Sequence, residues 1–152
     1  MPSEELRLRL QETRERKESE VLPGRLAGVR CLGYRQAADL PDWIPAKIGE
    51  FTRTDSVPAT AISEEAGPER VNAWLEAFAH GQGLGTHVLL RTGMAFFPWL
   101  ECQLPESGWA TIVRGALGDD LFVASADGNV LVVVFAEEYD YQGFAAHAPE
   151  KR

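Results

Sequence analysis

Five acidic residues and two tyrosines flank two apolar segments near the C-terminal end of this sequence. The segments are DLFVASA (120–126) and NVLVVVF (129–135), joined by Asp127–Gly128, a dipeptide typical of a β-hairpin turn. The polar residues around their outer ends are Asp119, Asp120, Glu137, Glu138, Tyr139, Asp140 and Tyr141. Carboxylates bind arginine, lysine or hard cations, and tyrosine combines contact area with a polar tip. These seven residues are the candidate binding residues of the chain.

The hairpin signal predicts which residues of the two strands lie opposite each other. With a two-residue loop at 127–128, Phe122 lies opposite Val133. Side chains alternate between the two faces of a strand pair. One face then carries Phe122, Ala124, Leu131, Val133 and Phe135, and the other carries Leu121, Val123, Val130, Val132 and Val134. Because both faces are apolar, we expect both to be covered, by helices or by another subunit.

The same register gathers the acidic residues at the open end of the hairpin. If strand geometry continues, one face carries Asp119, Glu138 and Asp140, and the other carries Asp120, Glu137, Tyr139 and Tyr141. Residues 115–150 contain seven acids and no lysine or arginine, so no base within that segment neutralises the cluster.

Three interpretations of this cluster stay open. It is a solvated sheet end whose charges prevent edge-to-edge association, or a recognition surface for a basic partner. The third is a weaker Mg²⁺ or Ca²⁺ site built from Asp119, Glu138 and Asp140, which no recognised loop spacing supports.

The charge of the whole chain favours a basic protein as partner. The formal net charge is −8 and the pI is about 4.9. Nucleic-acid binding normally requires a basic stripe that displaces counterions, and the sequence has none, so we expect no nucleic-acid partner. Complementary charge accelerates encounter with a basic protein, although a net charge also serves solubility alone.

Other residues that could perform chemistry lack a supporting pattern. HGQGLGTH (80–87) has the order helix, glycines, strand and no lysine, so it predicts a helix end and connector and not a phosphate loop. Cys102 and the scattered histidines could form a Cys–His pair, but no catalytic motif surrounds them. We therefore expect no catalytic residue and no cofactor, and the sequence inclines against an enzyme.

The elements that must position these residues are helices and strands of an α+β fold. Apolar periodicity and capping signals predict helices at 3–20, 68–80 and about 107–117. Strands are predicted at 87–92, 95–104, 120–126 and 129–135, with Pro98 indicating an edge or a bulge. The expected architecture is a mainly antiparallel sheet of four or more strands in the C-terminal half with helices packed on it, plus an N-terminal helix.

Residues 26–66 are the hardest part of the chain to interpret. LAGVRCLGYR and IGEFTRT resemble strands, and DLPDWIPAK, with two prolines, predicts a loop between them. The expected organisation is a polar N-terminal helix or arm at 1–22, one α+β domain at 23–147 and a tail at 148–152.

Composition predicts a cytoplasmic location. The N-terminal residues are charged throughout and lack an apolar stretch, which argues against a secretory signal, and no run is long enough to span a membrane. Cys31 and Cys102 lack metal-finger or redox spacing and are expected to be free thiols. Twelve arginines against three lysines suggest a bacterial source.

These observations favour a small acidic protein-binding module that engages a basic partner. Its concrete form is an inhibitor or immunity-type protein that masks a toxin, which is analogy at the level of a class. One alternative is a small-molecule-binding protein or enzyme with a pocket between residues 26–66 and the sheet. Another is a self-associating subunit that buries the second hairpin face against a copy of itself.

Overall fold

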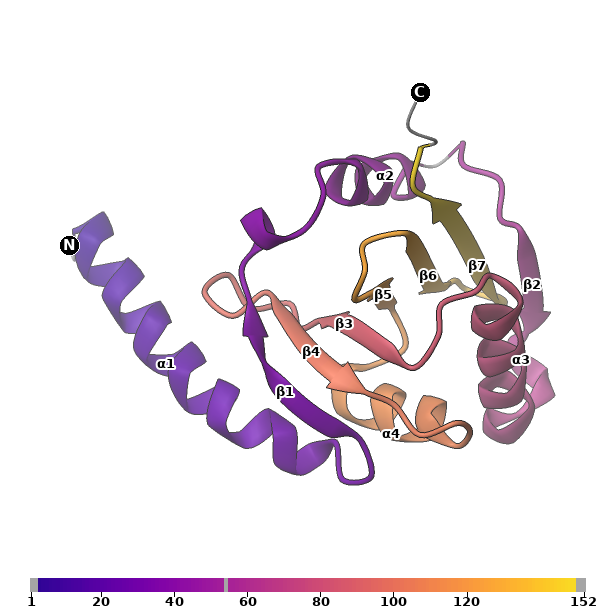
Figure 1. Cartoon of the computed structure of the whole chain (residues 1–152), viewed down its shortest axis with the longest axis horizontal. Coiled ribbons are helices and arrows are strands. Elements are labelled where there is room, and N and C mark those ends of the chain that lie inside the picture. The colour runs from indigo at the N-terminus through magenta and orange to yellow at the C-terminus, as the bar shows by residue number, and fades with distance from the viewer. Residues whose placement is uncertain (1–2, 54, 150–152) are drawn as a thin grey trace.

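The computed structural model describes residues 3–53 and 55–149. Over these residues the chain forms one seven-stranded antiparallel sheet with helices on both faces (Figure 1). The order of strands across the sheet is β1-β4-β3-β5-β6-β7-β2. The predicted α+β class, with a mainly antiparallel sheet and an N-terminal helix, is confirmed.

The elements of the described residues have the following bounds. The strands are β1 (Arg30–Arg35), β2 (Thr60–Ser63), β3 (His87–Arg91), β4 (Trp99–Gln103), β5 (Leu121–Ser125), β6 (Val130–Ala136) and β7 (Asp140–His147). The α-helices are α1 (Glu4–Arg25), α2 (Trp43–Phe51), α3 (Pro68–Gly81) and α4 (Trp109–Leu117). Short 3-10 helices occupy Ala37–Asp39 (η1) and Glu64–Ala66 (η2).

The β5–β6 hairpin lies near the middle of the sheet with the predicted register. Phe122 lies opposite Val133, and the pairing runs from Leu121↔Val134 to Ala124↔Leu131. The strands end at Ser125 and begin at Val130, so four residues connect them where two were expected. The extra residues come one from each strand, and the register is therefore unchanged.

Both faces of this hairpin are covered, as the sequence predicted. Leu121, Val123 and Val132 belong to a core that also contains residues of α1, α3 and α4. Ala124, Leu131 and Val133 belong to a second core that contains residues of α2. We call these two sides of the sheet the three-helix face and the α2 face.

Helix α2 corrects the interpretation of residues 26–66. The segment predicted as a loop and a following strand forms this helix, whose Ile44 and Ile48 are buried on the sheet. Pro45 lies in the first turn, where a helix needs no backbone N–H from it. Ile44, Ile48 and Phe51 repeat at helical spacing, but the prolines and β-branched residues obscured that pattern.

Strands β2 and β7 were not predicted. β7 pairs with β6 from Val130↔His147 to Ala136↔Tyr141, and β2 pairs with β7 from Thr60↔Gly143 to Ser63↔Asp140. β7 contains glycine and two alanines in place of β-branched residues, which weakens its strand signal. Pro98 was expected to mark an edge or a bulge. It lies just before β4, which is an interior strand between β1 and β3, and the register irregularity of that pairing lies in β1 between Cys31 and Gly33.

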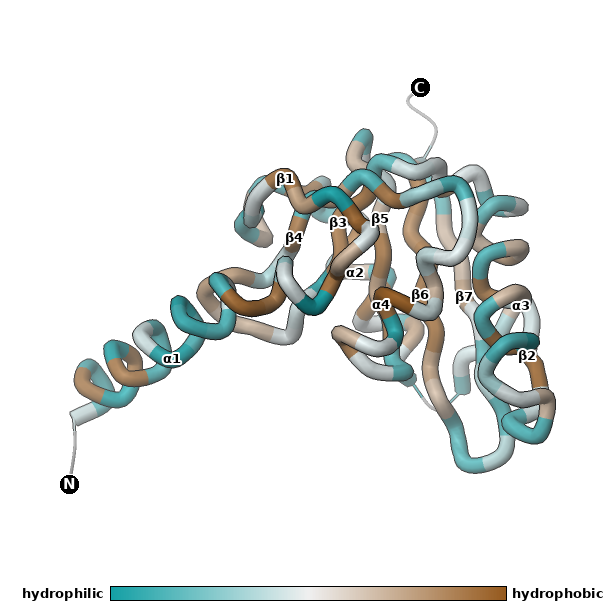
Figure 2. Tube along the Cα trace, turned by 90° about the horizontal axis from the view of Figure 1, so that it is seen from below, coloured by the Kyte–Doolittle hydropathy of each residue, from teal (hydrophilic) through white to brown (hydrophobic). Residues whose placement is uncertain are grey.

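Helix α1 extends beyond the predicted range of 3–20, continues through Pro23 and Gly24, and ends at Arg25. Pro23 lacks the N–H that would bond to the carbonyl oxygen of Ser19, and the Tyr34 hydroxyl of β1 donates to that oxygen at 2.7 Å. Burial raises the pKa of Tyr34 to about 12, so the donor keeps its proton. Figure 2 shows the N-terminal part of α1 extending away from the rest of the chain.

A side-chain cap and two ion pairs stabilise α1. Ser3 accepts from the Leu6 N–H, and the Glu5–Arg9 and Glu12–Arg16 pairs form at 3.0 Å. None of the helices in residues 3–53 and 55–149 has the length and apolar character that a membrane crossing requires.

We expect Ile44→Ala to lower the free energy of unfolding by about 2–5 kcal/mol, because it removes a fully buried side chain from the α2 core. Urea unfolding followed by circular dichroism measures this loss. The exposed control on the same helix, Lys47→Ala, should change stability by about 0.5 kcal/mol or less, since its ion pair with Glu50 is at the surface. A loss below about 1 kcal/mol for Ile44→Ala would contradict the packing of α2 on the sheet.

The turn that sets the hairpin register should show a pH-dependent contribution to stability. The Asp127 carboxylate accepts from the Ser125 hydroxyl at 2.6 Å and from the Asn129 N–H at 3.0 Å, and these hydrogen bonds lower its pKa. A carboxyl group whose pKa is lower in the folded state stabilises the fold at pH values above its unfolded-state pKa of about 3.9. This stabilisation is lost as the pH falls through the folded-state pKa.

We therefore expect Asp127→Asn to be less stable than wild type in urea at pH 7, with the difference shrinking at pH 3. Asp42→Asn is the control, because Asp42 makes no side-chain capping bond at the start of α2. A difference between Asp127→Asn and wild type that stays constant from pH 7 to pH 3 would show that the charge on Asp127 does not contribute.

Candidate functional site

The acidic segment after β6 is the turn of a second hairpin. The Glu137 N–H donates to the Asp140 carbonyl oxygen at 2.8 Å, which leaves Glu138 and Tyr139 at the tip. The side chain of Tyr139 is 71% exposed. The apolar residues of β6 are therefore followed by acidic residues because the chain reverses there and returns as β7 beside β6.

Asp119 and Asp120 lie at the same end of the sheet, as predicted. The Asp120 carboxylate accepts from the Ala136 N–H at 2.8 Å, which joins the start of β5 to the end of β6. The β2–β7 pairing also brings Glu64 to this end of the sheet, which the sequence did not indicate. The Glu64 N–H donates to the Tyr139 carbonyl oxygen at 3.1 Å. We call Asp119, Asp120, Glu137, Glu138, Tyr139 and Asp140 the acidic end.

The predicted division of the acids between the two faces is wrong beyond Ala136, because a turn replaces continued strand geometry. Glu137 lies on the α2 face, where it lines a pocket with Phe135 and Gln142. Tyr141 lies on the three-helix face, where it packs against the core. Glu137 and Tyr141, expected on one face, are therefore on opposite faces.

Arg114 of α4 is a base beside the acidic end that the sequence interpretation did not include. It lies one position before residues 115–150, the segment that contains no lysine or arginine. Its Nη2 atom is 2.9 Å from Oδ1 of Asp119. It also donates to the Tyr141 hydroxyl at 3.3 Å and lies over that ring, 5.1 Å from its centre. Its other nitrogen donates to the Asn72 side chain of α3 at 2.6 Å.

Local structure explains why Arg114 is held in this position. Gly108 before α4 has no side chain with which to cap the helix. Glu76 of α3 supplies the cap, because its carboxylate accepts from the Gly108 and Ala110 N–H groups at 2.8 and 3.1 Å. Arg114 thus engages the exposed Asp119 carboxylate and the Tyr141 hydroxyl, whereas Glu137, Glu138 and Asp140 have no ion pair within the described residues.

The described residues do not form the Mg²⁺ or Ca²⁺ site considered for Asp119, Glu138 and Asp140. In the described residues no three acidic, histidine or cysteine side chains are placed to hold one metal ion. Asp119 is paired with Arg114, and the β6–β7 turn separates Glu138 from the strand geometry on which the candidate depended.

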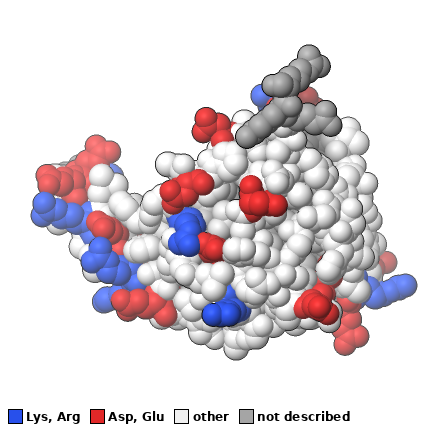
Figure 3. All heavy atoms as spheres, in the orientation of Figure 1, with Lys and Arg blue, Asp and Glu red and all other residues white. Residues whose placement is uncertain are grey.

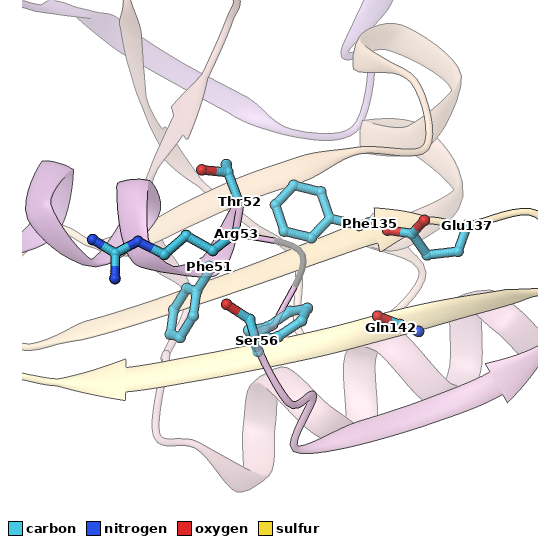
Figure 4. Close-up of a pocket in the computed structure, with 8 residues that line it drawn as sticks. Phe51, Thr52, Arg53, Ser56, Phe135, Glu137 and Gln142 are labelled. Atoms are coloured by element: carbon cyan, nitrogen blue, oxygen red, sulfur yellow. The ribbon is translucent and has the colours of Figure 1, made fainter.

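A pocket of about 340 Å³ adjoins the acidic end on the α2 face (Figure 4). Its lining comes from the end of α2 and the following residues, and from β6 and β7. These residues are Phe51, Thr52, Arg53, Ser56, Phe135, Glu137, Gln142 and Phe144. A pocket therefore lies between residues 26–66 and the sheet, and it shares Glu137 with the acidic end.

The cysteines and histidines do not form a catalytic pair in the described residues. Cys102 is fully buried and lies opposite Cys31 in the β1–β4 pairing, and burial raises the pKa of both thiols. His87 contacts the Glu101 carboxylate at 2.6 Å, and Arg35 pairs with the same carboxylate. HGQGLGTH connects α3 to β3, as predicted.

The charges of α1 differ from those of the acidic end. In Figure 3 acidic and basic side chains alternate along the extended helix, which makes α1 close to balanced. The net negative charge of the chain is therefore carried mainly by the rest of the molecule.

No family model, no curated protein and no solved structure matches this chain. Functional proposals therefore depend on its own geometry.

We expect Arg114→Ala to lower the free energy of unfolding by about 1–3 kcal/mol, because three hydrogen-bond partners lose a half-buried charged donor. Arg114→Lys should recover only part of this loss, since lysine keeps the charge but not the planar fork. Urea unfolding compares both with Arg7→Ala on the exposed end of α1. Equal stability of Arg114→Ala and Arg7→Ala would contradict a positioning role for Arg114.

Proposed function

We propose that this chain is a protein-binding module that engages a basic protein through the acidic end of its sheet. The observation that carries the proposal is the concentration of Glu137, Glu138 and Asp140 around the exposed Tyr139. All four residues belong to one tight turn that projects from the sheet.

The local charges support this proposal. Arg114 pairs with the Asp119 carboxylate and donates to the Tyr141 hydroxyl, and it forms no ion pair with Glu137, Glu138 or Asp140. The carboxylates of Glu137 and Glu138 are exposed and available to a partner. Exposed carboxylates of one sign raise the encounter rate with a basic surface, and a central tyrosine supplies contact area.

The concrete form that we propose is an inhibitor or immunity-type protein that covers a basic surface on a toxin. This form rests on analogy with a class of function. The proposed setting is the cytoplasm of a bacterium, which the arginine-rich composition and the two thiols support.

A second candidate function is small-molecule binding in the pocket beside Glu137. The specific observation in its favour is the position of this pocket between residues 51–53 with Ser56 and the sheet, where aromatic and polar groups come together. We do not propose self-association through the hairpin, because α2 covers the hairpin face that a second copy was expected to bury.

The test is capture of partners by the tagged chain from a native bacterial lysate at low and high salt. We expect a basic protein in stoichiometric amount that dissociates as salt rises, because screening weakens exposed charge pairs. The triple reversal Glu137→Lys, Glu138→Lys and Asp140→Lys should weaken binding of that protein about tenfold or more, since attractive pairs become repulsive.

The matched control changes the net charge by the same amount on α1, with Glu4→Lys, Glu5→Lys and Glu20→Lys. This variant should retain the partner at close to the wild-type affinity. If both triple variants bind equally well, or equally poorly, the acidic end is not the recognition surface.

A further inference from the structure

We infer that the pocket beside Glu137 receives an arginine side chain of the basic partner. The guanidinium lies against the phenylalanine floor of the pocket and donates hydrogen bonds to oxygen acceptors on its walls. This inference rests on the proposed function and names the chemistry that its partner presents.

The floor of the pocket is aromatic. Phe144 is 3% exposed, and its ring centre lies 5.1 Å from that of Phe51 and 5.7 Å from that of Phe135. Phe51 and Phe135 are only partly buried, so their rings remain accessible from the pocket. A planar delocalised cation gains from contact with such rings through cation–π attraction and stacking.

The polar groups on the walls are acceptors. The Ser56 hydroxyl donates its proton to the Glu50 carbonyl oxygen at 2.6 Å, and the Thr52 hydroxyl donates to the Gly49 carbonyl oxygen at 2.8 Å. A hydroxyl has one proton, so both groups have only lone pairs left to offer a ligand. The lining therefore favours a ligand rich in donors.

Gln142 and Glu137 extend the same pattern. The Gln142 side-chain nitrogen is directed to the Asp140 carboxylate at 3.5 Å, which orients the amide so that its oxygen lies on the side of Ser56 (Figure 4). The Glu137 carboxylate accepts only. Hydroxyl, amide and carboxylate oxygens thus border one aromatic recess.

Among the described residues that line the pocket, Arg53 alone is basic, and it does not neutralise this recess. Figure 4 shows Arg53 pointing away from Glu137 and Gln142, and no ion pair joins it to another described residue. A cation placed beside Glu137 is therefore on the far side of the pocket from the Arg53 guanidinium.

These features distinguish arginine from lysine. The guanidinium has five N–H donors in a plane and stacks on aromatic rings, whereas the ammonium is a compact, strongly hydrated charge with three donors. An exposed acidic turn alone attracts both cations equally. The aromatic floor and the several acceptors add a preference for arginine on top of that attraction.

The test measures binding of fluorescently labelled nona-arginine and nona-lysine peptides to the full chain at low salt by anisotropy. We expect wild type to bind the arginine peptide about tenfold more tightly than the lysine peptide. Glu137→Gln and Phe135→Leu should each reduce that ratio to about twofold or less, because one removes the carboxylate and the other the ring face.

The matched control is Glu138→Gln, which makes the same charge change one residue away, outside the pocket lining. This variant should weaken the binding of both peptides by the same small factor and leave the ratio of their affinities at its wild-type value. A wild-type circular dichroism spectrum and a cooperative unfolding transition in every variant confirm that the fold is retained.

The outcomes separate this inference from the proposed function. If both peptides bind wild type but the ratio is unchanged in Glu137→Gln and Phe135→Leu, the arginine pocket is wrong and the acidic surface stands. If neither peptide binds wild type, both are wrong. If N-acetylargininamide alone binds as tightly as the arginine peptide, the pocket is a small-molecule site, and docking of a protein side chain is overturned.

Discussion

The structure depends on the apolar character of both faces of the β5–β6 hairpin. A strand pair with valines and leucines on both sides is stable only when each side is covered. The chain provides α1, α3 and α4 on one side and α2 on the other, which produces two cores separated by one sheet. Charged groups are then excluded from the middle of these strands and appear where the strands end. The acidic end is a consequence of this separation.

The hairpin was predictable because its signals are local and agree with one another. The Asp–Gly turn and the period-two pattern of 120–135 define one register, and the structure has that register with Phe122 opposite Val133. The central apolar stretches of 68–80 and 107–117 likewise predict helices that are present. By contrast, α2 is short and contains Pro45, and β7 has few β-branched residues, so packing decides both. Local preference was too weak to indicate either element.

The same distinction applies to the candidate site. The acidic residues of 119–140 are close in the sequence or joined by the predicted hairpin, and their gathering followed from its register. Arg114 of α4 and Glu64, the residue after β2, reach them through tertiary contacts, which no spacing pattern contains. The pocket joins residues 51–53 and Ser56 to residues of β6 and β7, about eighty positions later in the chain. The unpredicted strands β2 and β7 and the unpredicted helix α2 thus concealed the Glu64 contact and the pocket beside the acidic end.

Protection of a sheet end and recognition of a partner are compatible roles for these acids. The outer strand β2 is only four residues long, and carboxylates near such an edge discourage pairing with another sheet. Protection alone, however, requires charge and is indifferent to what lies beside it. The acidic end instead adjoins a recess in which three phenylalanines meet hydroxyls whose protons are already donated. Because α2 must cover the hairpin, its last turn carries Phe51 to the same edge as Glu137. The covering of an apolar face thereby places an aromatic surface next to exposed carboxylates, which is the combination that a guanidinium recognises.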